Sequence, residues 1–165
     1  MHETEDDLRA LQDLLDRSHA NAGPHLRSLF TDDSRIPAAE LPELLRGVQV
    51  LALATVTARG EPRVAPVDGL FFRGRWHFGS AHNSARFRHI RARPAVSAAH
   101  VRGEQLAVVV HGTAHELNPR APEHAAFRAY LNQTYPGWDD AGWTAGAPYA
   151  RIEPAAMFTF RSGVG

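Results

Sequence analysis

Short apolar segments in close succession along residues 48–160 restrict the fold of this chain more than any other feature. Each is rich in β-branched or aromatic residues, and turns such as Thr57–Glu61 and Arg73-Gly74 separate them. We predict strands at Val48–Val56, Arg63–Val67, Leu70–Phe72, Arg75–Gly79, Ala95–Val101, Gln105–Glu116 and Tyr149–Phe160. Connections this short favour antiparallel pairing, and closure protects strand edges. We therefore expect a mainly β (α+β) fold built on a closed or partly open barrel of about six antiparallel strands.

Helical patterns precede and interrupt these strands. Leucines recur at helical spacing between Asp6 and His19, which predicts an amphipathic helix there. We expect shorter helices at about Ala38–Arg46, Asn83–Arg91 and Ala121–Leu131, and a loop at Tyr135–Pro148 whose tryptophans, Trp138 and Trp143, pack on the barrel or line a pocket. The chain is thus divided into an N-terminal helical extension, residues 1–46, and a barrel domain with peripheral helices, residues 47–165.

Two residue types are missing, and their absence excludes several chemistries. The chain has no cysteine, which excludes disulfides, thiolate metal sites and thiol nucleophiles. All 18 basic residues are arginine. Without lysine the chain cannot form a Schiff base with pyridoxal phosphate or build a lysine-containing phosphate loop. Arginine still binds phosphate well, because its planar fork reaches two oxygens at once.

Charge is unevenly distributed, although the formal net charge is zero. Acidic residues dominate residues 1–16, whereas residues 69–103 hold arginines and no acid. A basic segment in a neutral protein favours a local anionic ligand and argues against nucleic-acid binding. The N-terminus is acidic, and no apolar run is long enough for a membrane span, so we expect a cytoplasmic protein without a membrane partner.

The best candidate for a binding site follows the predicted strand Arg75–Gly79. Small residues come next, and a helix then begins with Asn83 or Ser84 as its N-cap. The first helical turn offers free N–H groups and the positive end of the dipole, and Arg86 lies just inside it. Further arginines follow in the sequence at Arg88, Arg91 and Arg93. This pattern is typical of a phosphate site, but a solvated basic helix face fits the same residues.

Other motifs are weaker. Small residues after Arg63, in the stretch Arg63–Val67, leave the backbone open to a flat ligand, although Arg63 also fits a surface position before a buried strand. His111 and His115 share a predicted strand but have no evident carboxylate partner, and no histidine pair has metal-binding spacing. The motif G-x-S-x-G of serine hydrolases is absent.

Taken in order, three segments resemble the pyridoxamine 5′-phosphate oxidase-like superfamily, the FMN-binding split barrel. LALATVTARGEPRVAPVDGLFF is similar to the opening strand pair of that family. WHFGSAHNSARFRHIRARPAVSAAH is similar to its strand, phosphate-binding helix start and following strand, and LAVVVHGTAHEL to the next strand. The resemblance covers Leu45 to Leu117 and a final strand at Tyr149–Phe160, and it implies a split β-barrel.

The resemblance also implies a cofactor site. The family holds the cofactor phosphate at the helix start and by basic residues there and on the second strand, while strand backbone follows the ring and ribityl chain. The residues implied to bind the cofactor are Arg63, Val64, Ala65, Pro66, Phe78, Gly79, Ser80, Ser84, Ala85, Arg86 and Arg88. The sequence departs from the family where Arg86 replaces the usual lysine and Ala85 a frequent arginine. Its ending, FTFRSGVG, lacks the substrate-binding residues of true pyridoxamine phosphate oxidases, so that reaction is not assigned.

We therefore expect a homodimeric oxidoreductase that transfers a hydride to or from a small conjugated substrate. FMN is the first expectation for the cofactor and the deazaflavin F420 the alternative, and the cofactor would lie between the subunits. Because the cofactor supplies the redox chemistry, no catalytic residue is assigned. Two alternatives stay open: a flavin-binding protein without turnover, and a haem-handling protein in which His111, His115 or another histidine ligates iron.

Overall fold

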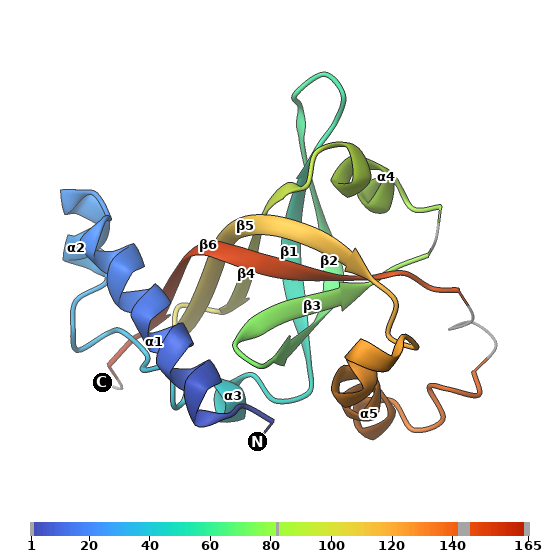
Figure 1. Cartoon of the computed structure of the whole chain (residues 1–165). Coiled ribbons are helices and arrows are strands. Elements are labelled where there is room, and N and C mark those ends of the chain that lie inside the picture. Colours follow the sequence, from blue (N-terminus) through green and yellow to red (C-terminus); the bar gives the residue numbers. More distant parts are fainter. Residues whose placement is uncertain (1, 82, 142–145, 164–165) are drawn as a thin grey trace.

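Six antiparallel strands form a closed barrel in the computed structural model, which describes residues 2–81, 83–141 and 146–163 (Figure 1). The strands are β1 (Val48–Val56), β2 (Pro62–Phe72), β3 (Arg75–Gly79), β4 (Ala95–Arg102), β5 (Leu106–Leu117) and β6 (Tyr149–Arg161). Their order around the barrel is β1-β2-β3-β6-β5-β4, and β4 pairs with β1 to close it. The predicted mainly β fold with a six-stranded antiparallel barrel is confirmed.

The second strand is longer than the sequence suggested. We predicted two segments, Arg63–Val67 and Leu70–Phe72, but β2 runs through both without a break. Gly69 does not interrupt the ladder, because it pairs with Gln49 on β1. A Cβ at Gly69 would lie 2.5 Å from the side chain of Leu51, so the glycine is needed for close packing inside the barrel.

Helices surround the barrel and differ from the prediction mainly in the N-terminal region. They are α1 (Glu5–Ala20), α2 (Pro24–Leu29), α3 (Leu41–Leu44), α4 (Ala85–Ala92), the 3₁₀ helix η1 (Pro122–His124) and α5 (Ala125–Thr134). Helix α2 was not predicted, and α3 is shorter than the expected Ala38–Arg46. The N–H of Ala38 donates instead to the side chain of Gln12 at 2.9 Å, which ties this stretch to α1 rather than to a helix.

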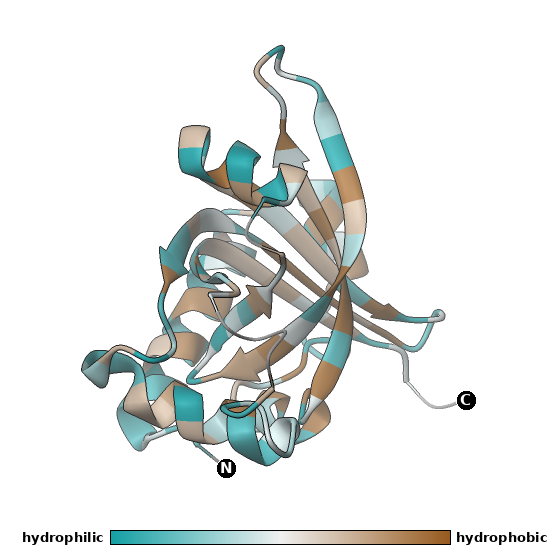
Figure 2. Ribbon diagram, turned by 90° about the vertical axis from the view of Figure 1, so that its right-hand side faces the viewer, coloured by the Kyte–Doolittle hydropathy of each residue, from teal (hydrophilic) through white to brown (hydrophobic). Residues whose placement is uncertain are grey.

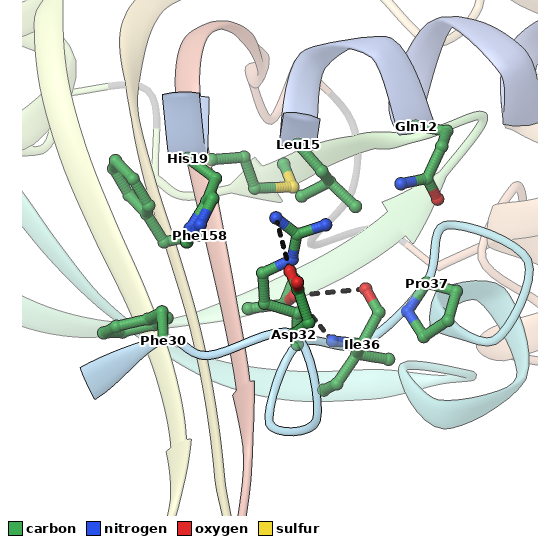
Figure 3. Close-up of a pocket in the computed structure, with 11 residues that line it drawn as sticks. Gln12, Leu15, His19, Phe30, Asp32, Ile36, Pro37 and Phe158 are labelled. Carbon is green, nitrogen blue, oxygen red and sulfur yellow. Dashed lines mark hydrogen bonds and ion pairs between the residues drawn. The ribbon is translucent and has the colours of Figure 1, made fainter. Parts of the chain in front are cut away.

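The N-terminal region packs on β6 through buried polar contacts. Ser18 on α1 accepts a hydrogen bond from the N–H of Met157 at 3.0 Å, and the Thr159 hydroxyl exchanges hydrogen bonds with both backbone groups of Ile36. Figure 3 shows α1 on one side of this contact and the segment around Ile36 on the other. Leu11 and Leu45 belong to the same apolar cluster as the barrel interior. The division into an extension, 1–46, and a barrel domain, 47–165, stays a prediction.

A second apolar cluster fills the space between α5 and the barrel. Its helical members are Phe127, Tyr130 and Leu131, all of which are buried. Trp138 is buried in the same cluster, and so packs on the barrel, whereas Trp143 lies outside the described residues. No helix in the described part of the chain is long and apolar enough to cross a membrane.

The β1–β2 hairpin projects beyond the barrel next to α4, as both ribbon views show (Figures 1 and 2). Strand β3 pairs with β2 only along Gly69–Phe72. Within the described residues, the stretch 62–68 of β2 therefore has a strand neighbour, β1, on one edge alone. The open edge faces the region where α4 begins, and this geometry positions the candidate site.

Candidate functional site

Helix α4 begins where the sequence predicted, with Ser84 as its N-cap. The Ser84 hydroxyl accepts the N–H of Phe87 at 3.4 Å. Phe87 and Ile90, on this helix, are buried in the core. On the same helix, His89 Nδ1 lies 2.9 Å from the Thr55 hydroxyl of β1, which anchors α4 to the hairpin. The position of the helix start is thus fixed by packing and by a side-chain hydrogen bond.

The first turn of α4 has two backbone donors available. The N–H of Ser84 donates to the carbonyl of Ala81, and that of Phe87 to the Ser84 hydroxyl. The N–H groups of Ala85 and Arg86 have no acceptor in the described part of the chain. Free donors at the positive end of a helix favour an anion, and a phosphate fits this requirement.

Arg86 connects the helix start to the open edge of β2. Its guanidinium donates to the carbonyl oxygen of Pro66 at 3.2 Å. Within a strand, the N–H and C=O of one residue point to the same side, and alternate residues point the same way. The backbone groups of Val64 therefore also face the open edge. A proline is tolerated at position 66 because an open edge requires no N–H there.

The other predicted cations make local contacts. Arg63 donates to the Glu61 carboxylate at 2.8 Å and to the carbonyl of Pro62, beside the β1–β2 turn. Arg88 donates to the carbonyl of Asn83, just ahead of the helix. No described carboxylate pairs with Arg86 or Arg88, so their charge is not neutralised by an ion pair in the described part of the chain.

The structure brings together some of the predicted residues and separates others. Ser84, Ala85, Arg86 and Arg88 share one helical turn, and Arg86 reaches Pro66. On β2, Val64 and Pro66 are exposed and Ala65 is half-buried. Phe78 is fully buried, so only its backbone could contact a ligand. Arg63 does not join the helix start, because Glu61 holds it.

Gly79 and Ser80 line a cavity of about 380 Å³ between β2, β3 and the segment after α5. The other lining residues are Asp68, Leu70, Ala81, Tyr135, Ala147 and Tyr149. The ring of Tyr149 lies over Gly79, where a Cβ would come within 2.9 Å of it. Gly79 therefore lets an aromatic ring lie close against the end of β3.

The sequence analysis did not identify three residues that line this cavity: Asp68, Tyr135 and Tyr149. Tyr135 fell in an expected loop and Tyr149 at the start of an expected strand, so neither carried a motif. Asp68 offered one usable signal, since it is the one acidic residue of β2 and lies on the outward face of that strand. Burial, with the nearby Asp68 charge as a smaller cause, raises the pKa of Tyr135 to about 12. Burial also raises the pKa of Tyr149, whose hydroxyl accepts from Trp138 Nε1 at 3.1 Å.

Two of the other cavities among the described residues lie away from the predicted cofactor-binding residues. One, shown in Figure 3, lies between α1, the segment around Ile36 and β6, and has a volume of about 90 Å³. That is well below the roughly 300 Å³ of a typical small-molecule pocket. The other, of about 400 Å³, is lined by His2, Tyr130 and residues near Gly47, and none of the predicted cofactor-binding residues contributes to it.

The histidines named in the haem alternative are on the barrel surface. His111 and His115 are both exposed on β5, and the Nδ1 of His111 lies 2.8 Å from the Ser97 hydroxyl. In the register of the sheet, His115 lies opposite Arg151, a cation. The described residues contain no group of three His, Cys, Asp or Glu side chains that could hold a metal ion.

The antiparallel barrel is closed, but the stretch 62–68 of β2 has an open edge beside the capped start of α4. This arrangement defines a split-barrel protein of the pyridoxamine 5′-phosphate oxidase type. The family model for pyridoxamine 5′-phosphate oxidase matches residues 38–159, which is more than half of the chain. The chain belongs to this family. A comparison with curated proteins gives no match.

Solved structures with the same fold are named for different functions. The heme storage protein HutZ from Vibrio cholerae has 18% identity and a TM-score of 0.62, covering 74% of this chain and 93% of its own. An FAD-binding protein from Mesorhizobium loti has 23% identity and a TM-score of 0.58, covering 78% and 96%. An F420 reductase has 22% identity and a TM-score of 0.54, covering 70% and 94%. At these identities the similarity shows the fold alone.

Proposed function

We propose that the protein is an FMN- or F420-dependent oxidoreductase that transfers a hydride to or from a small conjugated substrate. The observation that carries the proposal is the contact of Arg86 with Pro66, which joins a phosphate-type helix start to an open strand edge. The similarity to an FAD-binding protein and an F420 reductase supports the same class of cofactor. FMN is the first choice and F420 the alternative.

The residues present fit a phosphate-bearing flavin or deazaflavin. The phosphate would be held by the N–H groups of Ala85 and Arg86 and by the guanidiniums of Arg86 and Arg88. Ser84 would stabilise the first turn of the helix as its N-cap. The open backbone of Val64–Pro66 would hold the flat ring system, and the backbone at Phe78–Ser80 would border it. Arg63, at the hairpin end of the same strand, is paired with Glu61 and would reach the cofactor only by leaving that carboxylate.

The bound cofactor supplies hydride transfer, and this chain supplies position and shelter from water. Arg86 orients the phosphate end relative to β2, because its guanidinium is fixed on the Pro66 carbonyl. Leu70 and Tyr149 line the adjoining cavity with apolar surface, which excludes water. The Tyr135 hydroxyl is protonated at neutral pH, as a tyrosine ordinarily is, and can donate a hydrogen bond; burial raises its pKa further, to about 12.

A second copy of the chain is part of the proposal. Outward-facing apolar residues gather on three adjoining strands, β2, β1 and β4, where Ala52 lies opposite both Pro66 and Ala99 and Val50 lies opposite Asp68. We call this set the outer apolar face: Val50, Ala52, Val64, Pro66, Ala99 and Val101. Val50, Val64 and Val101 are 61%, 67% and 56% exposed. Exposed apolar groups of this extent mark interaction surfaces. A copy docked here would also cover the open edge at Val64–Pro66, so a homodimer would complete the cofactor site.

The proposed phosphate contact is tested with Arg86→Ala. The variant should bind FMN or F420 at least about tenfold more weakly than the wild type, because a charge-assisted hydrogen bond is lost. The melting temperature of the apoprotein should change little, since the side chain is partly exposed. Flavin fluorescence quenching measures the affinity, and riboflavin, which lacks the phosphate, should lose little further in the variant.

Arg59→Ala, in the exposed β1–β2 turn, is the control for a general loss of positive charge and should bind FMN normally. Equal FMN affinity of Arg86→Ala and wild type would refute the site.

The visible spectrum of the purified protein tests the class of function. A flavin or deazaflavin spectrum that is bleached by a reduced nicotinamide or deazaflavin donor supports turnover. A stable flavin spectrum without reduction would favour a binding protein, and a Soret band lost on His111→Ala would favour haem.

A further inference from the structure

The cavity beside β3 has a lining that differs from the cofactor-binding residues around Arg86. It combines two tyrosine rings, from Tyr135 and Tyr149, with the carboxylate of Asp68 and the apolar side chain of Leu70. It contains no cationic side chain among the described residues. Gly79 and Ser80 belong both to this cavity and to the backbone expected along the cofactor. The cavity is therefore next to the cofactor site but opposite to it in charge.

Asp68 is the charged group of this cavity, and its carboxylate is unpaired. It projects from the outward face of β2, between the exposed Pro66 and the buried strand that follows. It makes no hydrogen bond or ion pair within the described residues. Its charge raises the pKa of both Tyr135 and Tyr149, although burial is the larger cause in each case. The carboxylate therefore lies near both phenol groups and is available to a ligand.

The tyrosines provide flat surfaces and one free hydroxyl. The Tyr149 hydroxyl accepts from Trp138 Nε1, which fixes its ring over Gly79. The Tyr135 hydroxyl has no hydrogen-bond partner in the described part of the chain. Aromatic faces attract cations through the negative potential above the ring. The half-buried ring of Tyr135 beside the Asp68 carboxylate forms a lining that suits a flat, positively charged molecule and disfavours an anion, while the buried ring of Tyr149 lies against Gly79.

We propose that this cavity is the substrate pocket, and that Asp68 is the residue that restricts it to flat, conjugated cations. The assignment as a substrate pocket rests on the proposed oxidoreductase function, whereas the preference for cations rests on the lining alone. A volume of about 380 Å³ is enough for one substituted aromatic ring system. Phosphorylated or carboxylated substrates are disfavoured, because their negative charge would face Asp68.

Three flat probes of similar size and different charge test this preference: 1-methylnicotinamide, a cation; nicotinamide, which is neutral; and nicotinate, an anion. Binding to the purified protein, with whatever cofactor it carries, is followed by NMR titration at pH 7. The wild type should bind 1-methylnicotinamide at least about fivefold more tightly than nicotinate. In Asp68→Asn, which keeps the shape of the side chain, the two affinities should agree within about twofold.

Two further variants separate charge from shape. Tyr135→Phe keeps the ring and should keep the preference for the cation, whereas Tyr135→Ala should weaken all three probes. Asp13→Asn, which removes an exposed acid on α1, is the control for net charge and should behave as the wild type.

Equal affinity of the wild type for 1-methylnicotinamide and nicotinate would overturn the inference, as would a preference that survives in Asp68→Asn. If FMN binds normally and the preference is absent, only this inference fails. If the preference is present without any flavin binding, the proposed function fails instead.

Discussion

The two sides of the barrel are built differently. Strands β5 and β6 pair along their whole lengths, from Leu106 opposite Arg161 to Leu117 opposite Tyr149, whereas β1 and β4 pair only around Ala52–Ala54. The β5–β6 side is also covered by α1. On the β1–β2 side, a hairpin projects into solvent with exposed valines and an open strand edge. We infer that the β5–β6 side is the more rigid one, while the β1–β2 side keeps backbone and apolar groups available for binding.

The largest effect is expected from overpacking the β5–β6 side. Gly112 lies at a β-bulge, and a Cβ there would be 2.1 Å from the carbonyl oxygen of Glu153 on β6. Backbone cannot move away as a flexible side chain can. Gly112→Ala should therefore lower the free energy of unfolding by about 3 kcal/mol, measured by urea denaturation.

Gly23→Ala is the matched control, because a Cβ at Gly23 would meet nothing within 4 Å. It should change the free energy of unfolding by no more than about 0.5 kcal/mol. If Gly112→Ala were as stable as Gly23→Ala, the bulge would be free to adjust, and the β5–β6 side would not be the rigid one.

A smaller, pH-dependent effect is expected from His77, which is buried on β3 and stacks on Phe127 with ring centroids 4.3 Å apart. Burial, aided by the charges of Arg151 and Arg75, lowers the pKa of His77 from 6.5 to about 3. The folded protein thus binds this proton less readily than the unfolded chain does. The stability contribution is complete above pH 6.5 and is lost progressively as pH falls towards 3.

Between pH 6 and 4, His77 should therefore steepen the loss of unfolding free energy by about 1.4 kcal/mol per pH unit. His77→Phe should remove this part of the slope, while His25→Gln, an exposed histidine on α2, should leave it unchanged. The slope is the informative quantity, because His77→Phe also removes the hydrogen bond from Nδ1 to the carbonyl of Arg75. Equal slopes for wild type and His77→Phe would show that protons reach the ring in the folded state.

Much of the barrel could be predicted from the sequence, since its strands are marked by local residue patterns. The Arg73-Gly74 turn is an example, because both residues adopt positive φ, as a tight hairpin with the right-handed twist of its strands requires. The prediction failed where long-range contacts decide the structure. Gly69 reads as a break in the sequence, but the packing of Leu51 requires a glycine within a continuous strand.

The candidate site was predictable only in part, for the same reason. Helix capping is local, so Ser84 could be identified as one of two candidate caps before the structure was known. The contact between Arg86 and Pro66 joins residues 20 positions apart, and no local pattern encodes it. The pocket around Asp68 was even harder to predict from the sequence. Tyr135 and Tyr149 come from separate parts of the chain and line one cavity with Asp68 only in the folded barrel.

The smallest effect on folding, and the most direct test of the β1–β2 side, is expected from the outer apolar face. Val50→Glu and Val64→Glu should each convert the proposed dimer into a monomer, because a carboxylate would be buried between the copies. The melting temperature of the dissociated chain should change little, since both valines are largely exposed within one subunit. Light scattering coupled to size exclusion measures the mass, and flavin affinity should fall along with the dimer. Leu29→Glu places the same charge at another exposed apolar residue, on α2 outside this face, and should leave the dimer intact. A wild-type monomer that binds FMN stoichiometrically would mean that the open edge of β2 needs no second copy to cover it.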